Sequence, residues 1–200
     1  MSRPLNDAER ATPSNAWLTR YYAVRGLFSI VWVVIAVTVG PMPTVLAGLL
    51  LVSYPAWDAL ANVADARRNG GLRSNATQTF NAAVSAVTTI AVLIALTRGM
   101  HAVIGVIGVW AALSGLLQLA TAVRRWKRAG GQWVMVISGA QSAAAGAAFL
   151  RDAGGTEAPS VADVAPYAAF GAFYFLVSAV WLSVSTARRR REMAAARQRR

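Results

Sequence analysis

Six long apolar stretches run along the chain, and charged or turn-forming residues separate them. The stretches cover residues 22–40, 43–64, 78–97, 102–123, 133–150 and 164–186. A helix that crosses a bilayer needs roughly 20 apolar residues, and each stretch is close to that length. A soluble helix would repeat polar residues every three or four positions, which residues 103–117 do not. The pattern therefore predicts an all-α membrane protein with six transmembrane helices between a polar tail (1–21) and an Arg-rich tail (187–200).

Composition supports the same fold class. Hydrophobic residues make up 56% of the 200 residues and charged residues only 14%, against about 25% in typical soluble domains. The chain has no Cys and a single His, which leaves no disulfide, no thiolate ligand and no histidine cluster for a metal. Neither a Gly-rich phosphate loop nor a pair of intramembrane carboxylates is present. We therefore expect neither an enzyme nor a bound cofactor.

The basic residues are distributed unevenly between the segments that join the spans. If the spans alternate in direction, one side of the membrane carries 18 of the 20 Lys and Arg residues, with Arg25 counted there. The other side carries only Arg98 and Arg151. Basic residues in short loops stay on the cytoplasmic side of a membrane. The distribution therefore predicts that both termini are cytoplasmic.

The basic clusters directly follow apolar spans, where such clusters bind anionic lipid headgroups. The residues concerned are Arg67, Arg68, Arg124, Arg125, Lys127, Arg128, Arg188, Arg189, Arg190 and Arg191. Their position favours membrane lipids over nucleic acid as the partner. A homo-oligomer is a further expectation that the sequence leaves open.

The even-numbered spans repeat one another. An offset of 60 aligns residues 64–71 with 124–131, including both Gly-Gly pairs, and aligns Gly48 with Gly108. An offset of 123 brings Gly171 to the same position. The odd-numbered spans align at three serines, which are Ser29, Ser85 and Ser142. The chain is therefore predicted to use one helical hairpin three times, as transporters and merely duplicated packing units both do.

Several short motifs resemble the HdeD-like family of small bacterial membrane proteins. They are Arg25-Gly26-Leu27-Phe28, the spacing of Gly48 and Tyr54 with a following Asp58, and Gly115-Leu116-Leu117-Gln118-Leu119 before a basic loop. The resemblance covers residues 22–186 and implies an inner-membrane protein with six spans, built from short repeats of unknown function. Its name-giving member implies a link to acid resistance, and the family supplies no catalytic residues. The outer loop at 151–163 is longer than the repeat requires.

Two formal charges, Arg25 and Asp58, fall within the spans, where charges are costly and usually have a function. Each lies near the inner end of its span, and a short turn joins the two helices. We therefore predict an Arg25–Asp58 ion pair. The repeat offsets place an amide pair, Asn81 and Gln118, at the same positions of the second hairpin. Such groups either hold helices together or handle a proton or a ligand.

The third hairpin has Ser138 and Trp181 at these positions and retains little polarity. Residues 138–148 are all small or polar, which predicts that the fifth span lies in the interior of the bundle. His101 lies at an outer turn, where an imidazole would titrate as the outside acidifies. It is a candidate pH-responsive residue, and the alternative is an ordinary loop residue.

Three functions remain open after this reading. The first is an HdeD-like structural or acid-stress-protective role. The second is a small transporter or channel that uses Asp58, and the third is a scaffold that recruits cytoplasmic partners. A continuous polar cavity that meets Asp58 favours transport, whereas a bundle sealed by small residues favours the structural role.

Overall fold

The computed structural model of the protein describes residues 15–38, 44–125 and 132–198, and within them it is entirely helical. The long helices are α1 (Asn15–Thr38), α2 (Thr44–Arg68), α3 (Ala76–Leu96), α4 (Met100–Arg125), α5 (Gln132–Ala153) and α6 (Ala165–Gln198). Two short 3-10 helices, η2 (Leu72–Ser74) and η3 (Val161–Val164), lie between them. All six long helices are long and apolar enough to cross a membrane, with mean hydropathies of 1.3 to 2.0 over their best windows. The six predicted apolar helices are confirmed.

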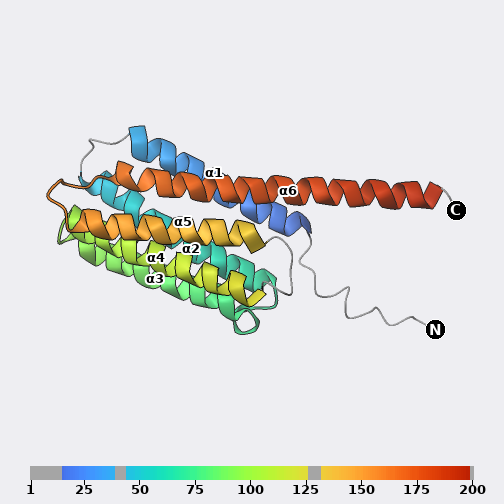
Figure 1. The fold of residues 1–200 in the computed structure, drawn as a ribbon, viewed down its shortest axis with the longest axis horizontal. Coiled ribbons are helices and arrows are strands. Elements are labelled where there is room, and N and C mark those ends of the chain that lie inside the picture. The colour runs from blue at the N-terminus through green and yellow to red at the C-terminus, as the bar shows by residue number, and fades with distance from the viewer. Residues whose placement is uncertain (1–14, 39–43, 126–131, 199–200) are drawn as a thin grey trace.

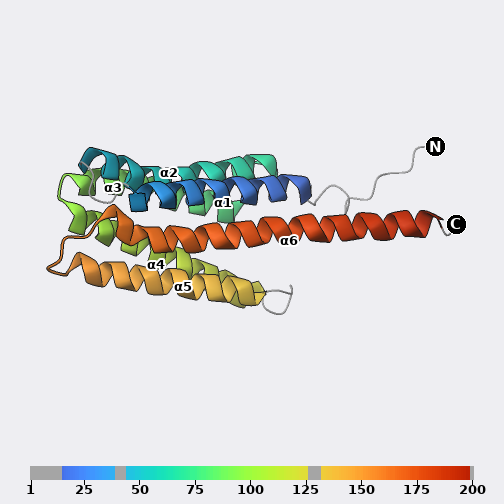
Figure 2. The same ribbon diagram turned by 90° about the horizontal axis from the view of Figure 1, so that it is seen from above.

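α1 and α6 extend furthest beyond their apolar stretches. α1 begins at Asn15 instead of Tyr22, so that Trp17, Tyr21 and Tyr22 belong to the helix. α6 has 34 residues, which corresponds to about 51 Å against roughly 30 Å for a bilayer core. It projects beyond the other helices in both ribbon views (Figures 1 and 2). Its last part is rich in Ala and Arg, which are strong helix formers, so the Arg-rich tail continues the helix.

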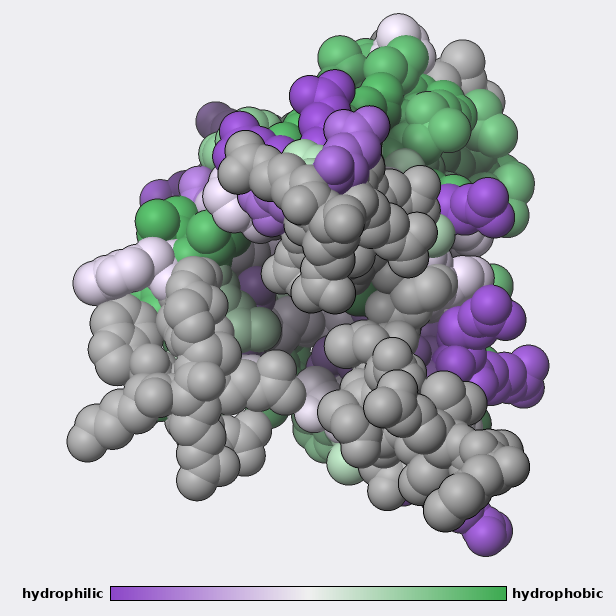
Figure 3. Space-filling view, turned by 90° about the vertical axis from the view of Figure 1, so that its right-hand side faces the viewer, coloured by the Kyte–Doolittle hydropathy of each residue, from purple (hydrophilic) through white to green (hydrophobic). Residues whose placement is uncertain are grey.

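The helices alternate in direction, so that α1 begins and α6 ends at the same end of the bundle (Figure 1). We call this the basic end; the opposite one, with the turn at residues 97–99 and the segment 154–160, is the far end. Arg67, Arg68 and Arg73 are exposed at the basic end. Hydrophilic side chains gather there in the space-filling view (Figure 3).

The closest packing joins different hairpins. α2 packs on α3, α4 on α5, and α6 returns to pack on α1, which closes a ring of six helices. Helices consecutive within the first and third hairpins, α1 with α2 and α5 with α6, approach each other far less. The two helices of the first hairpin, and those of the third, are therefore neighbours in sequence without packing closely against each other. Each hairpin instead contributes one helix to each of two tight pairs.

Glycines produce the tightest of these pairs, between α4 and α5. A Cβ on Gly115 would lie 2.5 Å from the carbonyl oxygen of Gly139, and one on Gly146 would lie 2.7 Å from that of Gly108. Small residues at such positions let two backbones approach closely in lipid.

The glycines of α5 pack against α4, a second face lines the bundle interior at Gln141 and Phe149, and a third face is exposed, as at Trp133 and Ile137. The prediction that α5 lies in the interior of the bundle is wrong. The small residues of α5 are accounted for by close packing against α4 alone, so they do not require α5 to be surrounded by other helices.

The apolar core occupies the half of the bundle near the far end. Trp32, Leu51, Val92 and Ile104 contribute to it and are at most 2% exposed. η3 folds back onto this core and buries Val161 and Val164. A capping box holds the turn, since the backbone N–H of Ser160 donates to Asp163 Oδ2 at 2.6 Å. The half near the basic end holds the polar groups described below.

We predict that Gly115→Ala lowers the stability of the protein by about 1–3 kcal/mol, because an added methyl group overpacks the α4–α5 contact. Gly105→Ala in the same helix is the matched control, since its Cβ would meet only Ala153 Cβ at 3.4 Å. Thermal unfolding of both variants in detergent micelles measures the difference. Equal midpoints for the two variants would contradict the packing described here.

Candidate functional site

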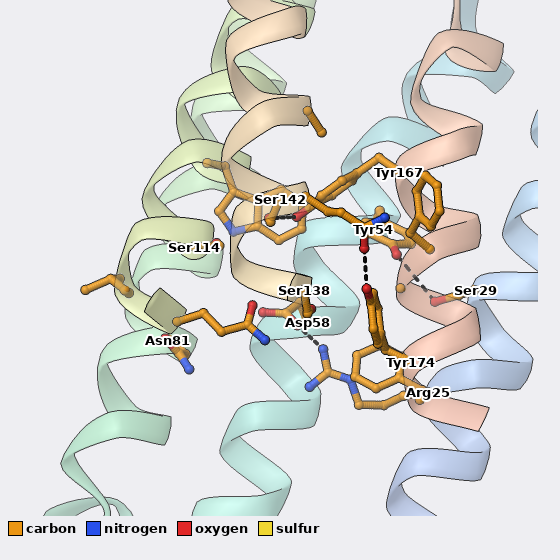
Figure 4. Close-up of a pocket in the computed structure, with 18 of the residues that line it drawn as sticks. Arg25, Ser29, Tyr54, Asp58, Asn81, Ser114, Ser138, Ser142, Tyr167 and Tyr174 are labelled. Atoms are coloured by element: carbon orange, nitrogen blue, oxygen red, sulfur yellow. Dashed lines mark hydrogen bonds and ion pairs between the residues drawn. The ribbon is translucent and has the colours of Figure 1, made fainter. Parts of the chain in front are cut away.

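A cavity of about 1510 Å³ lies inside the ring, and all six helices line it. Its lining runs from Asp65 and Gln78 near the basic end to Asp152 and Asp163 near the far end. Arg25, Asp58 and Ser138 point into the same space from three helices (Figure 4). The ring therefore surrounds a cavity whose lining includes Asp58 and several other polar side chains.

Arg25 and Asp58 form an ion pair between α1 and α2. Their side chains are 13% and 20% exposed. Arg25 Nη1 also donates to the Tyr21 hydroxyl at 2.7 Å, and its Cζ lies 4.2 Å from the ring centroid of Phe175. The guanidinium thus connects α1 to α2 and α6, while its charge is balanced by Asp58.

The carboxylate of Asp58 accepts further hydrogen bonds at its second oxygen. Asn62 Nδ2 donates to Oδ2 at 3.0 Å, and Ser85 Oγ donates to it at 2.7 Å. Ser85 in turn accepts from Trp110 Nε1 at 3.2 Å. One carboxylate therefore links α1, α2 and α3 directly, and α4 through Ser85.

Asn81 and Gln118 line the same cavity from α3 and α4 but do not form a pair. Within the part of the chain that the structure describes, no hydrogen bond joins them, and neither has another side-chain partner. Ser114 and Ser138 are in the same situation. These four uncharged groups border the same cavity as the ion pair and are available to a ligand.

The repeat alignment matches the positions of the residues in space. Arg25, Asn81 and Ser138, one from each repeat, all line the cavity. The three aligned serines are buried and hydrogen-bonded, for example Ser29 to the Tyr54 hydroxyl at 3.4 Å. Trp181 is 74% exposed and takes no part. The cavity therefore lies where the three repeats converge.

Sequence reasoning missed the aromatic residues of the site. A row of rings crosses the bundle, with consecutive centroids 5.1 to 6.2 Å apart, and consists of Trp32, Tyr54, Trp110, Tyr167 and Phe149. Two of them, Tyr54 and Tyr167, also bind Ser29 and Ser142 through their hydroxyls. This aromatic row separates the polar cavity from the apolar core. The spacing of Tyr167 and Tyr174, two helical turns apart, is a signal that would have placed both on one face of α6.

The remaining predicted residues lie away from the cavity. His101 begins α4 at the far end, where its Nε2 lies 3.1 Å from the carbonyl oxygen of Glu157. Arg67, Arg68, Arg188 and Arg191 are exposed. Arg124, Arg125, Arg189 and Arg190 belong to α4 and α6, but their side chains are outside the described part, as are residues 127 and 128 altogether. No three His, Asp or Glu side chains among the described residues gather as a metal site.

One known family matches part of the chain, over residues 80–151. It is described as a short repeat of unknown function (DUF308). The match covers most of α3, all of α4 and most of α5. No curated protein and no solved structure matches the chain. Together with the six apolar helices, the family match indicates an integral, multi-pass membrane protein.

We predict that Arg25→Gln or Asp58→Asn alone costs about 3–5 kcal/mol of stability, because each leaves the other charge unpaired in the bundle. The double variant should cost less than the sum of the two, and a double-mutant cycle of thermal stability measures the coupling. Arg151 and Asp152 provide the control pair: their side chains are 81% and 43% exposed, so their coupling should be about 0–1 kcal/mol. Equal coupling in both cycles would contradict a structural role for the buried pair.

Proposed function

We propose that this protein binds a polar ligand in its central cavity and carries it across the membrane. The observation that supports this is a cavity of about 1510 Å³ with polar side chains that lack protein partners, inside a ring of apolar helices. Polar groups within a bilayer are costly and are kept where they line a water-filled or ligand-filled space. A bundle that served only for packing would close such a space with small residues, as α4 and α5 do between themselves.

In this proposal the lining residues have distinct roles. Asn81, Gln118 and Ser138 contact the ligand, because their polar groups are not used by the protein. Asp58 already accepts from three side chains, so it fixes the position of Arg25 and does not bind the ligand directly. The aromatic row lies between the polar part of the cavity and the far end, and transport requires the ligand to pass this row.

The same proposal includes the membrane topology. Because the sequence assigns 18 of the 20 Lys and Arg residues to one side of alternating spans, we infer that the basic end faces the cytoplasm of a bacterial inner membrane, with both termini. Exposed arginines at the ends of α2 and α6 bind anionic headgroups there. The acid-protective role that the HdeD-like resemblance implies stays a prediction, as does a homo-oligomer.

A thiol-reactivity experiment tests the cavity. Because the chain has no Cys, Ser138→Cys introduces a unique thiol into the cavity and Ile137→Cys one on the outer face of the same helix. A polar methanethiosulfonate should modify position 138 at least about tenfold faster, since only a hydrated thiol ionises readily.

Modification at position 138 should then slow transport by the protein in liposomes. A panel of protons, potassium, glycerol, urea and alanine provides the flux measurement, with empty vesicles and the modified Ile137→Cys protein as controls. Equal reactivity at positions 137 and 138 would contradict the polar cavity and with it the proposed function.

Labelling of spheroplasts tests the topology. Ser74 and Thr156 are both exposed, at the basic and far ends respectively. A membrane-impermeant maleimide should label Thr156→Cys in intact spheroplasts, and Ser74→Cys only after lysis. Labelling of Ser74→Cys before lysis would reverse the orientation.

A further inference from the structure

The lining of the cavity changes character toward the far end. Between α5 and α6, around the level of Phe149 and Tyr167 of the aromatic row, the lining is mostly apolar. The apolar residues are Ala144, Ala145, Ala148, Phe149, Pro166 and Phe170. We call this stretch between α5 and α6 the seam.

The seam connects the cavity with the lipid-facing surface. Ala144 and Phe170 both line the cavity and are exposed, Phe170 by 51%. α5 and α6 are also the consecutive long helices with the weakest backbone contact. The small side chains of α5 leave the space between the two helices open on this side.

Two tyrosines of α6 stand between the seam and the polar part of the cavity. The Tyr174 hydroxyl donates to Gln141 Oε1, and the Tyr167 hydroxyl lies 3.2 Å from Ser142 Oγ. Both hydrogen bonds cross from α6 to α5. A molecule that enters through the seam therefore meets polar groups only after passing apolar walls.

Large side chains bridge the other two hairpins. Between α1 and α2, Phe28 stacks on Trp57 with centroids 4.6 Å apart, next to the Arg25–Asp58 pair. Between α3 and α4, Trp110 donates to Ser85, although Phe80 and Leu117 of this hairpin also line the cavity and are exposed. In the third hairpin the tyrosines of α6 bridge to α5, and alanines of α5 line the cavity beside them.

The carboxylates of the lining are already satisfied, which bears on the charge of a ligand. Asp58 pairs with Arg25, and Asp152 pairs with Arg151 at 3.0 Å. Asp163 caps η3, and Asp65 accepts from Trp17, Asn69 and Gln78. Arg25 Nε and Trp57 Nε1 are buried without a hydrogen-bond partner, whereas the free side-chain groups at positions 81, 114, 118 and 138 are uncharged. The charges of Arg25 and Asp58 balance each other, and an uncharged hydrogen-bonding group is less costly to bury beside these free groups than an ion.

Building on the proposed function, we infer that the ligand is a single-chain amphiphile with an uncharged, hydrogen-bonding head. The head binds in the polar part of the cavity, and the apolar chain lies in the seam between α5 and α6. The ligand enters laterally from the bilayer. A water-soluble solute would need no apolar opening toward lipid.

Thiol protection in lipid nanodiscs tests this inference, with 1-monolauroylglycerol and glycerol as the probes. Ser138→Cys reports on the head site, Ala148→Cys on the seam, and Ile137→Cys on the outer face of α5. At three times its half-saturating concentration, the monoacylglycerol should slow N-ethylmaleimide labelling about fourfold at positions 138 and 148. Position 137 should be unaffected, and glycerol should protect neither site at the same concentration.

A second variant guards against indirect effects. Ala148→Leu fills the seam but leaves the polar part of the cavity unchanged, so in the Ser138→Cys background it should abolish protection by the monoacylglycerol. Persistent protection would overturn lateral entry.

Protection of position 138 by glycerol alone, with position 148 unaffected, would overturn the amphiphile and retain a soluble polar ligand. Absence of protection at both sites, with Ser138→Cys still reactive toward the polar reagent, would overturn this inference only. Loss of that reactivity would instead overturn the proposed function.

Discussion

Apolar helices in a hydrocarbon environment gain nothing by burying apolar side chains against one another, so backbone proximity and polar contacts must hold the ring together. In this protein the closest approach is concentrated between hairpins, above all at the glycines of α4 and α5. The helices within the first and third hairpins are left comparatively far apart. A central cavity follows directly, because six helices joined as three tight pairs cannot also close the space between the pairs.

The Arg25–Asp58 ion pair joins two helices that close backbone packing does not hold together. Arg25 and Asp58 connect α1 and α2, whose backbones approach each other little, and Ser85 extends the connection to α3. A low dielectric makes such a pair costly to break, since either partner alone would be an unpaired charge. The pair therefore fixes one wall of the cavity and leaves it electrically neutral. Uncharged amides and hydroxyls elsewhere in the lining then decide what the cavity binds.

The half of the bundle near the far end and the half near the basic end differ in the side chains that fill them. An apolar core and the aromatic row occupy the half near the far end, while the polar groups gather in the other half. The seam between α5 and α6 is the exception, because its apolar lining leads from the level of the row to the lipid-facing surface. This division gives the proposed site a polar part and an apolar part along a single path, which is the chemistry of an amphiphile.

Much of this architecture follows from the sequence alone. The apolar stretches determine six helices, since each is long enough to span a bilayer, and the repeat offsets identify Arg25, Asn81 and Ser138 as equivalent positions. The number of helices and the equivalent positions of the repeats both follow from the residues within each stretch. Local composition does not specify which helices pack together, because most faces of each helix are apolar and several carry small residues. Only the tertiary structure decided that α5 packs on α4 and faces outward, that α6 returns to α1, and that Asn81 and Gln118 face a cavity instead of each other. Those outcomes depend on contacts between segments far apart in the chain, which no local pattern encodes.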